Sequence, residues 1–158
     1  MLQIVLVTAL TGLLTVLVHH EGLLWISERA GRLGASRTRL AMAGIVTAIL
    51  MLHVVEIALY AGSIDLASNL LHLGRLAGQV HGTDLEMLYF SAETYTSLGF
   101  GDIVPTGPMR LLASFEPLNG LLMLGWSATF IHVEVDRFWR QPPLRENVEA
   151  IGSHRHRA

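Results

Sequence analysis

The chain has 158 residues, of which 51% are hydrophobic and 15% are charged, and its mean hydropathy of +0.46 is high for a soluble globular domain. Its net charge of −2 argues against a nucleic-acid-binding protein, because no basic stripe with interleaved aromatic residues accompanies it. The sequence contains no cysteine, which excludes disulfide bonds and thiolate metal sites. The high mean hydropathy and the low fraction of charged residues indicate an integral membrane protein.

Three apolar stretches, over about residues 2–26, 40–61 and 109–133, are each long enough to cross a bilayer, which takes about 20 helical residues. They predict a first transmembrane helix at 1–30, an outer helix at 40–62 and an inner helix at 108–139. We expect the first stretch to be retained as a helix, because it lacks the basic start and the small-residue cleavage site of a signal peptide.

Residues 63–83 separate the outer helix from the next apolar segment. Leu66, Leu70, Leu73 and either Leu76 or Ala77 recur at helical spacing, and Asp65 is available as an N-cap. This pattern predicts a short amphipathic helix that lies on the outer membrane surface or against the mouth of a pore.

The apolar segment at 84–96 is too short to span the bilayer. Thr83 followed by Glu86 fits a capping box, which predicts that a helix begins at this point. Short helices and irregular backbone occur at membrane depth only where they are buried in protein or line water. The sequence therefore predicts a re-entrant helix at 84–96.

This helix is followed by Ser97-Leu98-Gly99-Phe100-Gly101-Asp102, in which two glycines flank an aromatic residue. Gly99 and Gly101 accept backbone angles that a residue with a Cβ resists, so successive carbonyl groups can point at one axis. Carbonyl rings of that kind replace the water shell of a dehydrated potassium ion. The segment resembles the selectivity filter of the potassium-channel pore family. The order of elements over residues 40–140 is similar to the two-span pore module of bacterial members, with one extra helix in front.

The resemblance implies an all-α integral membrane protein with three transmembrane helices, a re-entrant pore helix and a filter loop at 97–102. It implies a homotetramer in contact with membrane lipid, since one chain supplies a quarter of the pore wall. K+ is then the permeant ion, held by the backbone carbonyls of Ser97, Leu98, Gly99, Phe100 and Gly101. No other cofactor, no small-molecule substrate and no enzymatic activity are expected. Ser97 stands where Thr is usual and Phe100 where Tyr is commoner, which leaves a weakly selective cation channel as the alternative.

The same resemblance assigns roles to residues around the filter. Thr96 and Glu93 are expected to support it, and Glu93 matches a position that faces the filter aspartate in some bacterial members. We therefore expect Glu93 and Asp102 to share a proton, with a solvated Glu93 at the pore mouth as the alternative. Gly120 lies close to the family's bending glycine and Gly125 is a second candidate hinge, although either glycine could instead permit close helix packing.

His53, Glu56, Glu116 and Asn119 are polar residues within the second and third apolar stretches. Their depths, counted at about 1.5 Å per residue, predict one buried hydrogen-bonded cluster behind the pore helix, with at least one carboxyl group protonated. We consider three roles for this cluster: structural support between helices, proton-sensitive gating and a metal site. The triplet His19-His20-Glu21 is expected to anchor the first helix at the membrane interface, with a pH-sensitive or partner contact as the alternative.

Arginines set the expected orientation. Four lie between residues 29 and 39 and five follow residue 136. The positive-inside rule then places the loop at 31–39 and the tail at 141–158 in the cytoplasm and the N-terminus outside, in a bacterial plasma membrane. An intramembrane metal-dependent enzyme built on His53, Glu56 and Glu116 is disfavoured, because no HExxH or GxSxG motif is present. A non-conducting membrane subunit is a further alternative.

Overall fold

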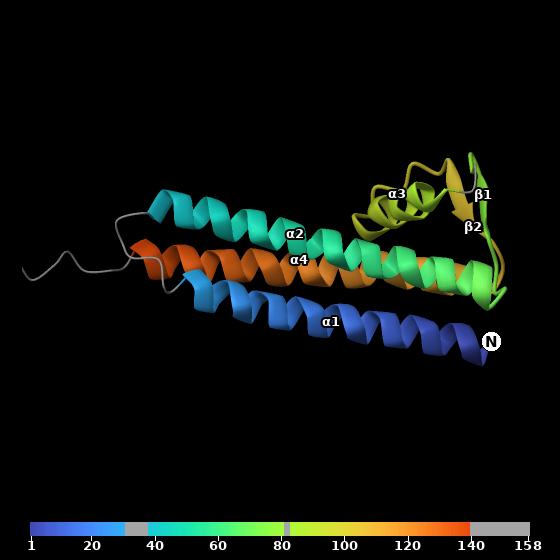
Figure 1. Cartoon of the computed structure of the whole chain (residues 1–158), viewed down its shortest axis with the longest axis horizontal. Coiled ribbons are helices and arrows are strands. Elements are labelled where there is room, and N and C mark those ends of the chain that lie inside the picture. The colour runs from blue at the N-terminus through green and yellow to red at the C-terminus, as the bar shows by residue number, and fades with distance from the viewer. Residues whose placement is uncertain (31–37, 81–82, 140–158) are drawn as a thin grey trace, which may run out of the picture.

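Three long helices lie side by side along the length of the molecule (Figure 1). They are α1 (Leu2–Ala30), α2 (Thr38–Asp65) and α4 (Arg110–Trp139). The computed structural model describes residues 1–30, 38–80 and 83–139, so most of the predicted loop at 31–39 and the whole tail at 141–158 lie outside the described residues. The N-terminus lies at the same end of the helices as the two short strands (Figure 1).

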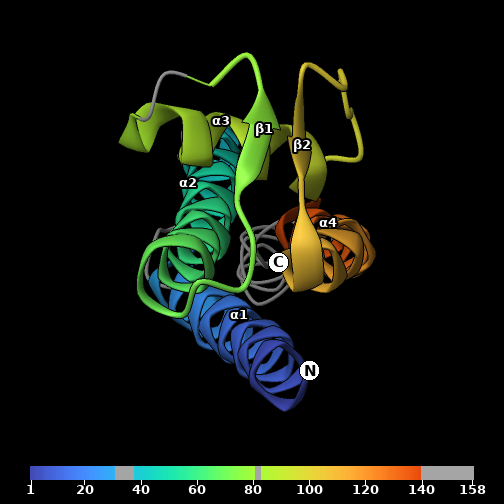
Figure 2. The same ribbon diagram turned by 90° about the vertical axis from the view of Figure 1, so that its right-hand side faces the viewer.

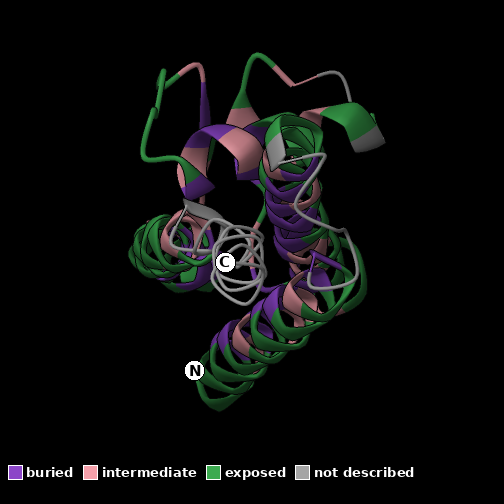
Figure 3. Ribbon diagram, turned by 90° about the vertical axis from the view of Figure 1, so that its left-hand side faces the viewer, coloured by how far each residue is buried: buried purple, intermediate pink, exposed green. Residues whose placement is uncertain are grey.

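The outer surface of these helices is largely apolar. Leucine and valine side chains of α1 and α2 are exposed, among them Leu13, Leu17 and Val54, and exposed positions dominate the outward sides in Figure 3. Within the described parts of the chain, two helical segments are long and apolar enough to cross a membrane, Leu2–Ala30 and Arg39–Leu70. The third long helix, α4, has 30 residues and carries more polar positions, including buried Glu116 and Glu134.

A shorter helix, α3 (Asp84–Tyr95), lies on the side of the α2–α4 pair that is opposite α1 (Figure 2). It begins after Thr83, whose backbone N–H donates to Glu86 Oε2 at 3.4 Å as in a capping box. It ends where the Thr96 N–H donates to the Ala92 carbonyl at 3.2 Å. The helix predicted at 84–96 is therefore present as a 12-residue helix between two of the long helices.

The segment between α2 and α3 differs from the predicted amphipathic helix. The helical chain of α2 continues through a π-helical turn, η2 (Leu66–Leu70), and Asp65 keeps helical angles instead of acting as an N-cap. Its carboxylate accepts a bond from Asn69 Nδ2 at 2.6 Å. The expected separate helix capped by Asp65 is wrong, because two of its leucines, Leu73 and Leu76, are buried by packing into the core and not by a helical face.

A pair of short strands follows, so the fold is mostly but not entirely helical. Strand β1 (Leu76–Gly78) pairs antiparallel with β2 (Ile103–Pro105), with Ala77 opposite Val104. One turn of 3₁₀ helix, η3 (Gly107–Met109), then leads into α4. The strands connect the segment that precedes α3 to the segment that follows residue 102.

Buried apolar side chains form two clusters along the bundle. One lies around α3 and the strands and includes Tyr60, Ile64, Phe90 and Leu112. The other joins the far ends of α1 and α2 and includes Leu23, Ile26, Ile45, Ile49 and Leu52. Buried polar residues occupy the helical positions between the two clusters: His19, His53, Glu56 and Ser127. Thr15, Glu116 and Asn119 are buried polar residues that lie beside the first cluster.

Candidate ion pathway and its buried support

The backbone of residues 97–101 alternates in handedness. Ser97, Gly99 and Gly101 have φ values of 61°, 53° and 79°, whereas the intervening Leu98 and Phe100 are not among the residues with positive φ. A Cβ built on Gly99 or Gly101 would meet no atom of this chain within 4 Å, so the backbone angle and not the available space requires glycine. Ser97 adopts the same left-handed region although it has a Cβ, so the backbone is strained at this residue.

Four consecutive amide groups of this segment bond to α3. The Ser97 N–H donates to the Thr94 carbonyl at 3.0 Å, and the N–H groups of Leu98 and Gly99 donate to the Glu93 carbonyl at 2.8 and 3.2 Å. The Phe100 N–H donates to Glu93 Oε2 at 3.0 Å. In a trans peptide the N–H and C=O groups point in opposite directions. The carbonyls of residues 96, 97, 98 and 99 are therefore directed away from α3.

Glu93 and Asp102 each have a separate partner. Glu93 is 4% exposed, so it is not solvated at a pore mouth, and its carboxylate accepts from Phe100. Asp102 Oδ2 accepts from the Tyr89 hydroxyl at 3.1 Å, and Oδ1 accepts from the Ile103 N–H at 3.1 Å. The expected proton shared by Glu93 and Asp102 is replaced by these bonds. Thr96 folds back, and its hydroxyl donates to the Ala92 carbonyl at 2.7 Å.

Tyr89 is a residue of the site that the sequence interpretation missed. Its hydroxyl bonds to Asp102, and its ring stacks on Phe100 with centroids 6.5 Å apart and planes 4° apart. Tyr89 precedes Glu93 by four residues, so both lie on one face of α3. The four-residue spacing of Tyr89 and Glu93 was the sequence pattern that could have identified Tyr89 as a residue of this site.

The strand pair holds the outer end of residues 97–102. The Gln79 N–H donates to the Asp102 carbonyl at 3.0 Å, directly beyond the β1–β2 ladder. At the other end of the ladder, the Thr106 N–H and hydroxyl both donate to the Arg75 carbonyl, at 2.9 and 2.8 Å. The strands thus fix where the segment leaves the site.

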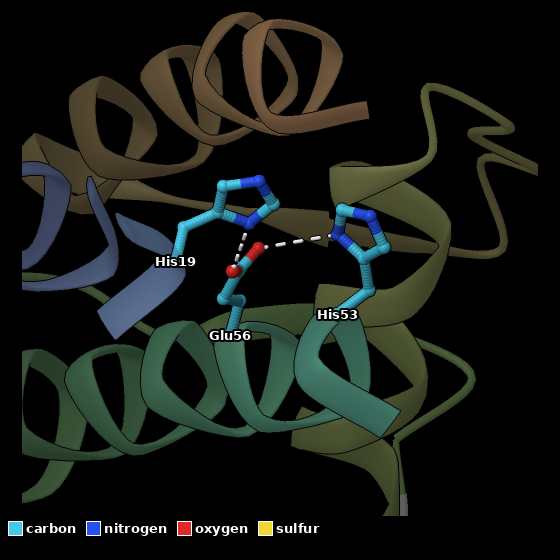
Figure 4. Close-up of side chains that lie close together, drawn as sticks. All are labelled: His19, His53 and Glu56. Carbon is cyan, nitrogen blue, oxygen red and sulfur yellow. Dashed lines mark hydrogen bonds and ion pairs between the residues drawn. The ribbon is translucent and has the colours of Figure 1, made fainter. Parts of the chain in front are cut away.

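A second group of polar residues lies in the middle of the bundle. Glu56 of α2 is fully buried, and two imidazoles flank its carboxylate (Figure 4). Nδ1 of His19, on α1, lies 2.7 Å from Glu56 Oε1, and Nδ1 of His53 lies 3.2 Å from Glu56 Oε2. The expected interfacial position of His19 is wrong, since its side chain is 0% exposed. His20 and Glu21 are exposed.

Two further helices complete this group, which we call the His–Glu network (His19, His53, Glu56, Tyr95 and Ser127). The Tyr95 hydroxyl of α3 donates to Glu56 Oε2, and it also lies 3.0 Å from His53 Nδ1. The Ser127 hydroxyl of α4 lies 3.1 Å from His53 Nε2 and 3.4 Å from His19 Nε2. The network therefore connects all four helices.

Glu116 and Asn119 do not join this network, which corrects the expectation of a single cluster of four. Asn119 Nδ2 donates to Thr15 at 2.5 Å and to the Tyr60 hydroxyl at 3.0 Å. Ser91 Oγ lies 2.5 Å from Glu116 Oε1 and 2.8 Å from the Ile57 carbonyl. A hydroxyl has one hydrogen, so it can bond to both only if the Glu116 carboxyl group is protonated and donates.

The periodicity of α1 was the missed signal for His19. The buried positions of this helix recur every three or four residues, and those in its middle are polar: Thr8, Thr11, Thr15 and His19. A polar stripe on an otherwise apolar helix faces protein and not lipid. His19 is the last residue of that stripe.

The two candidate hinge glycines have different surroundings. A Cβ on Gly120 would collide with the Tyr95 backbone carbonyl, so this glycine permits α3 to approach α4 closely. A Cβ on Gly125 would meet nothing within 4 Å. Gly120 therefore has a packing role, whereas the hinge role of Gly125 stays a prediction.

His19, His53 and Glu56 also form the group of described residues whose side-chain nitrogen and oxygen atoms, all within 4.8 Å of one another, come closest to a metal site. Ligands of a tetrahedral metal with bonds of about 2.0–2.1 Å lie about 3.3 Å apart. The His19 Nδ1 to Glu56 Oε1 distance of 2.7 Å is shorter and is that of a hydrogen bond. We therefore treat the group as a hydrogen-bonded network.

The chain thus places a short helix and a glycine-containing loop with positive φ angles between two long helices, α2 and α4. A family model described as an ion channel matches residues 53–135, more than half of the chain, and spans α3, the loop and most of α4. The chain belongs to this ion-channel family. Searches of curated proteins and of solved structures gave no match.

Proposed function

We propose that the chain is the subunit of a potassium-selective channel that conducts K+ passively through a filter formed by residues 97–101. The observation that carries the proposal is the bonding of four consecutive amides to α3, which directs the carbonyls of residues 96–99 away from that helix. Carbonyl oxygens arranged in this way can replace the hydration shell of K+. The permeant ion is the only small partner that the site requires.

A homotetramer follows from the same proposal. In one chain the filter side chains Leu98 and Phe100 are 59% and 66% exposed, so the described residues of a single protomer leave this segment uncovered. Four copies around an axis would surround the ion with carbonyls from each chain. The carbonyl end of α3 would then carry a partial negative charge toward the central cavity and favour a cation there.

In this arrangement α1, α2 and α4 all cross the membrane. At about 1.5 Å per residue, the 30 residues of α4 are long enough to do so. The N-terminus and the filter lie at the same end of the bundle (Figure 1), which agrees with an outward-facing filter and a cytoplasmic C-terminus.

Reversal potentials test the selectivity. Purified protein in planar bilayers should carry a current whose reversal potential follows an imposed K+ gradient and ignores a Na+ gradient. Equal responses to the two ions would favour the alternative of a weakly selective channel. That alternative arises because the chain has Ser97 and Phe100 where Thr and Tyr are more usual. Absence of any current would favour the non-conducting subunit.

Gly99→Ala tests the filter assignment. Alanine at a φ of 53° costs about 1–2 kcal/mol in backbone strain, and a tetramer carries this cost four times. We expect the K+ current to be lost while the protein still assembles, as judged by size-exclusion chromatography. Gly44→Ala, on α2, provides a matched control, because Gly44 lies within a helix and a Cβ there would meet nothing within 4 Å. Normal current in Gly99→Ala would contradict the assignment.

A further inference from the structure

The contacts of the His–Glu network limit how many protons the network holds. Glu56 faces three groups: His19 Nδ1, His53 Nδ1 and the Tyr95 hydroxyl. The opposite nitrogens of the two imidazoles, both Nε2, face the same Ser127 hydroxyl. Each imidazole therefore faces the carboxylate with Nδ1 and the shared hydroxyl with Nε2, and His53 Nδ1 also faces the Tyr95 hydroxyl at 3.0 Å.

An ionised Glu56 with two neutral imidazoles leaves one of these contacts without a hydrogen. Both Nδ1 atoms must then carry hydrogens to reach the carboxylate, so both Nε2 atoms are acceptors. Ser127 has one hydrogen and can donate to only one of them, and the closer is His53 at 3.1 Å. His19 Nε2, at 3.4 Å, would face an oxygen lone pair with its own lone pair.

One additional proton satisfies every contact. In one arrangement the proton is on His19, whose Nε2–H then donates to Ser127 Oγ. In the other arrangement the proton is on Glu56, whose O–H donates to His19 Nδ1, and the single hydrogen of His19 is on Nε2. Both arrangements contain the same number of protons and have no net charge. A neutral group is the form that burial within a membrane protein favours.

We propose that the His–Glu network is a binding site for one exchangeable proton, and that its occupancy controls the pore by strengthening the link from α1 and α2 to α4. The second part rests on the proposed channel function. The link acts at two places that matter for conduction. Ser127 belongs to the inner helix, and Tyr95 is two residues before Ser97, the first residue of the filter.

The ionisable groups around the network come from all the helices that pack on it. Tyr60 of α2 accepts a bond from Asn119, and Glu116 of α4 bonds to Ser91 of α3. On α1, His20 is exposed, and its ring contacts Trp126 at 5.8 Å. None of these side chains has a hydrogen bond to His19, His53 or Glu56 among the described residues, so each provides a control.

The first experiment measures the proton directly, without any current. Full-length protein labelled with ¹⁵N-histidine is placed in lipid bilayers, and imidazole shifts are recorded by NMR from about pH 4 to 10, which includes the range of imidazole titration. His19 and His53 should shift with one common midpoint. In Ser127→Ala, which removes the shared hydroxyl, the two midpoints should separate. Independent titration of the two imidazoles in the wild type, or no shift at either one, would overturn the proton site.

The second experiment measures the consequence for the pore. One charge-assisted hydrogen bond that is present in only one state shifts an equilibrium by about tenfold, so the open probability should change about tenfold over the pH range of the NMR midpoint. His19→Gln keeps an N–H donor for Glu56 but cannot titrate, and it should reduce this change to less than about twofold. His20→Gln and Glu116→Gln should retain the full response.

The outcomes separate the two proposals. A wild-type current that does not depend on pH, or a full response in His19→Gln, would overturn the control of the pore by this proton. Loss of the response in Glu116→Gln alone would assign the proton to Glu116 and overturn the site. A protein that carries no current at any pH contradicts the proposed function, whereas the NMR titration still decides whether the proton site exists.

Discussion

At the scale of single residues, Glu93 connects α3 to the proposed filter, residues 97–101, through both its main chain and its side chain. Its carbonyl accepts from two filter amides and its carboxylate from a third. The direction of the filter carbonyls is therefore set largely within one protomer, before other subunits contribute. For this role, the hydrogen-bond acceptor oxygens of Glu93 matter more than its negative charge.

Substitution of Glu93 can separate these two properties. Glu93→Ala leaves the Phe100 N–H without its acceptor, and we expect a loss of about 1–3 kcal/mol in the free energy of unfolding. Glu93→Gln keeps an amide oxygen in the same place and should lose less than half as much. Denaturant unfolding of the purified protein in detergent measures both values. Equal losses in the two variants would show that the charge, and not the acceptor, stabilises the filter.

At the scale of elements, the contact between α3 and α4 depends on one glycine. Gly120 lies directly against the Tyr95 carbonyl, at the end of α3 that leads into the filter. Any side chain at this position must push the two helices apart. The proposed filter would then move relative to α4.

The two glycines of α4 offer a matched pair of substitutions. Gly120→Ala should lower the free energy of unfolding by about 1–3 kcal/mol through overpacking. Gly125→Ala should raise it by up to about 1 kcal/mol through helix propensity, since a Cβ there has open space. Thermal unfolding of both variants measures the difference. A destabilised Gly125→Ala, together with an unaffected Gly120→Ala, would contradict the packing assignment.

The elements that the sequence predicted depend on local patterns. The long helices follow from apolar stretches, α3 from the Thr83 and Glu86 cap, and the strained loop from the two glycines. The β1–β2 pair could not be predicted in the same way, because its strands have three residues each and pair across the whole of α3. The only sequence feature of this pair that is typical of a strand is the β-branched dipeptide Ile103-Val104.

The sequence predicted which polar residues are buried, but it did not predict which of them are hydrogen-bonded to each other. His53, Glu56, Glu116 and Asn119 are all buried, yet depth along a helix says nothing about which way the helix is rotated. Packing of α1 decides the pairing, because Thr15 bonds to Asn119 and His19 bonds to Glu56. Contacts between residues so far apart in the chain require a tertiary structure.

At the scale of the whole molecule, one protomer exposes large apolar side chains on α4 and on the proposed filter. Leu118, Leu121 and Leu122 of α4 are 55–61% exposed, in addition to Leu98 and Phe100. Lipid can cover the outer faces of the helices, but a polar ion pathway must be closed by protein. The proposed assembly of four chains accounts for these side chains.

Ion binding should therefore stabilise the assembly. If K+ binds only the folded tetramer, its concentration raises the apparent stability by about 2.7 kcal/mol at one hundred times the dissociation constant for one site. The melting temperature should rise with added KCl and much less with NaCl at the same ionic strength. Gly99→Ala should remove the difference between the salts. An equal increase for both salts in the wild type would contradict a K+-selective filter.

The β1–β2 pair also has a consequence for the order of folding. Because residue 79 bonds to residue 102, α3 and the filter lie within a loop whose two ends are hydrogen-bonded neighbours. The contacts of α1 with α4 join residues more than one hundred positions apart, such as Thr15 and Asn119. Contacts between nearby residues form faster than contacts between distant ones. The pore loop can therefore take shape early, and the docking of α1, which brings His19 to Glu56, is the step that finishes the protomer.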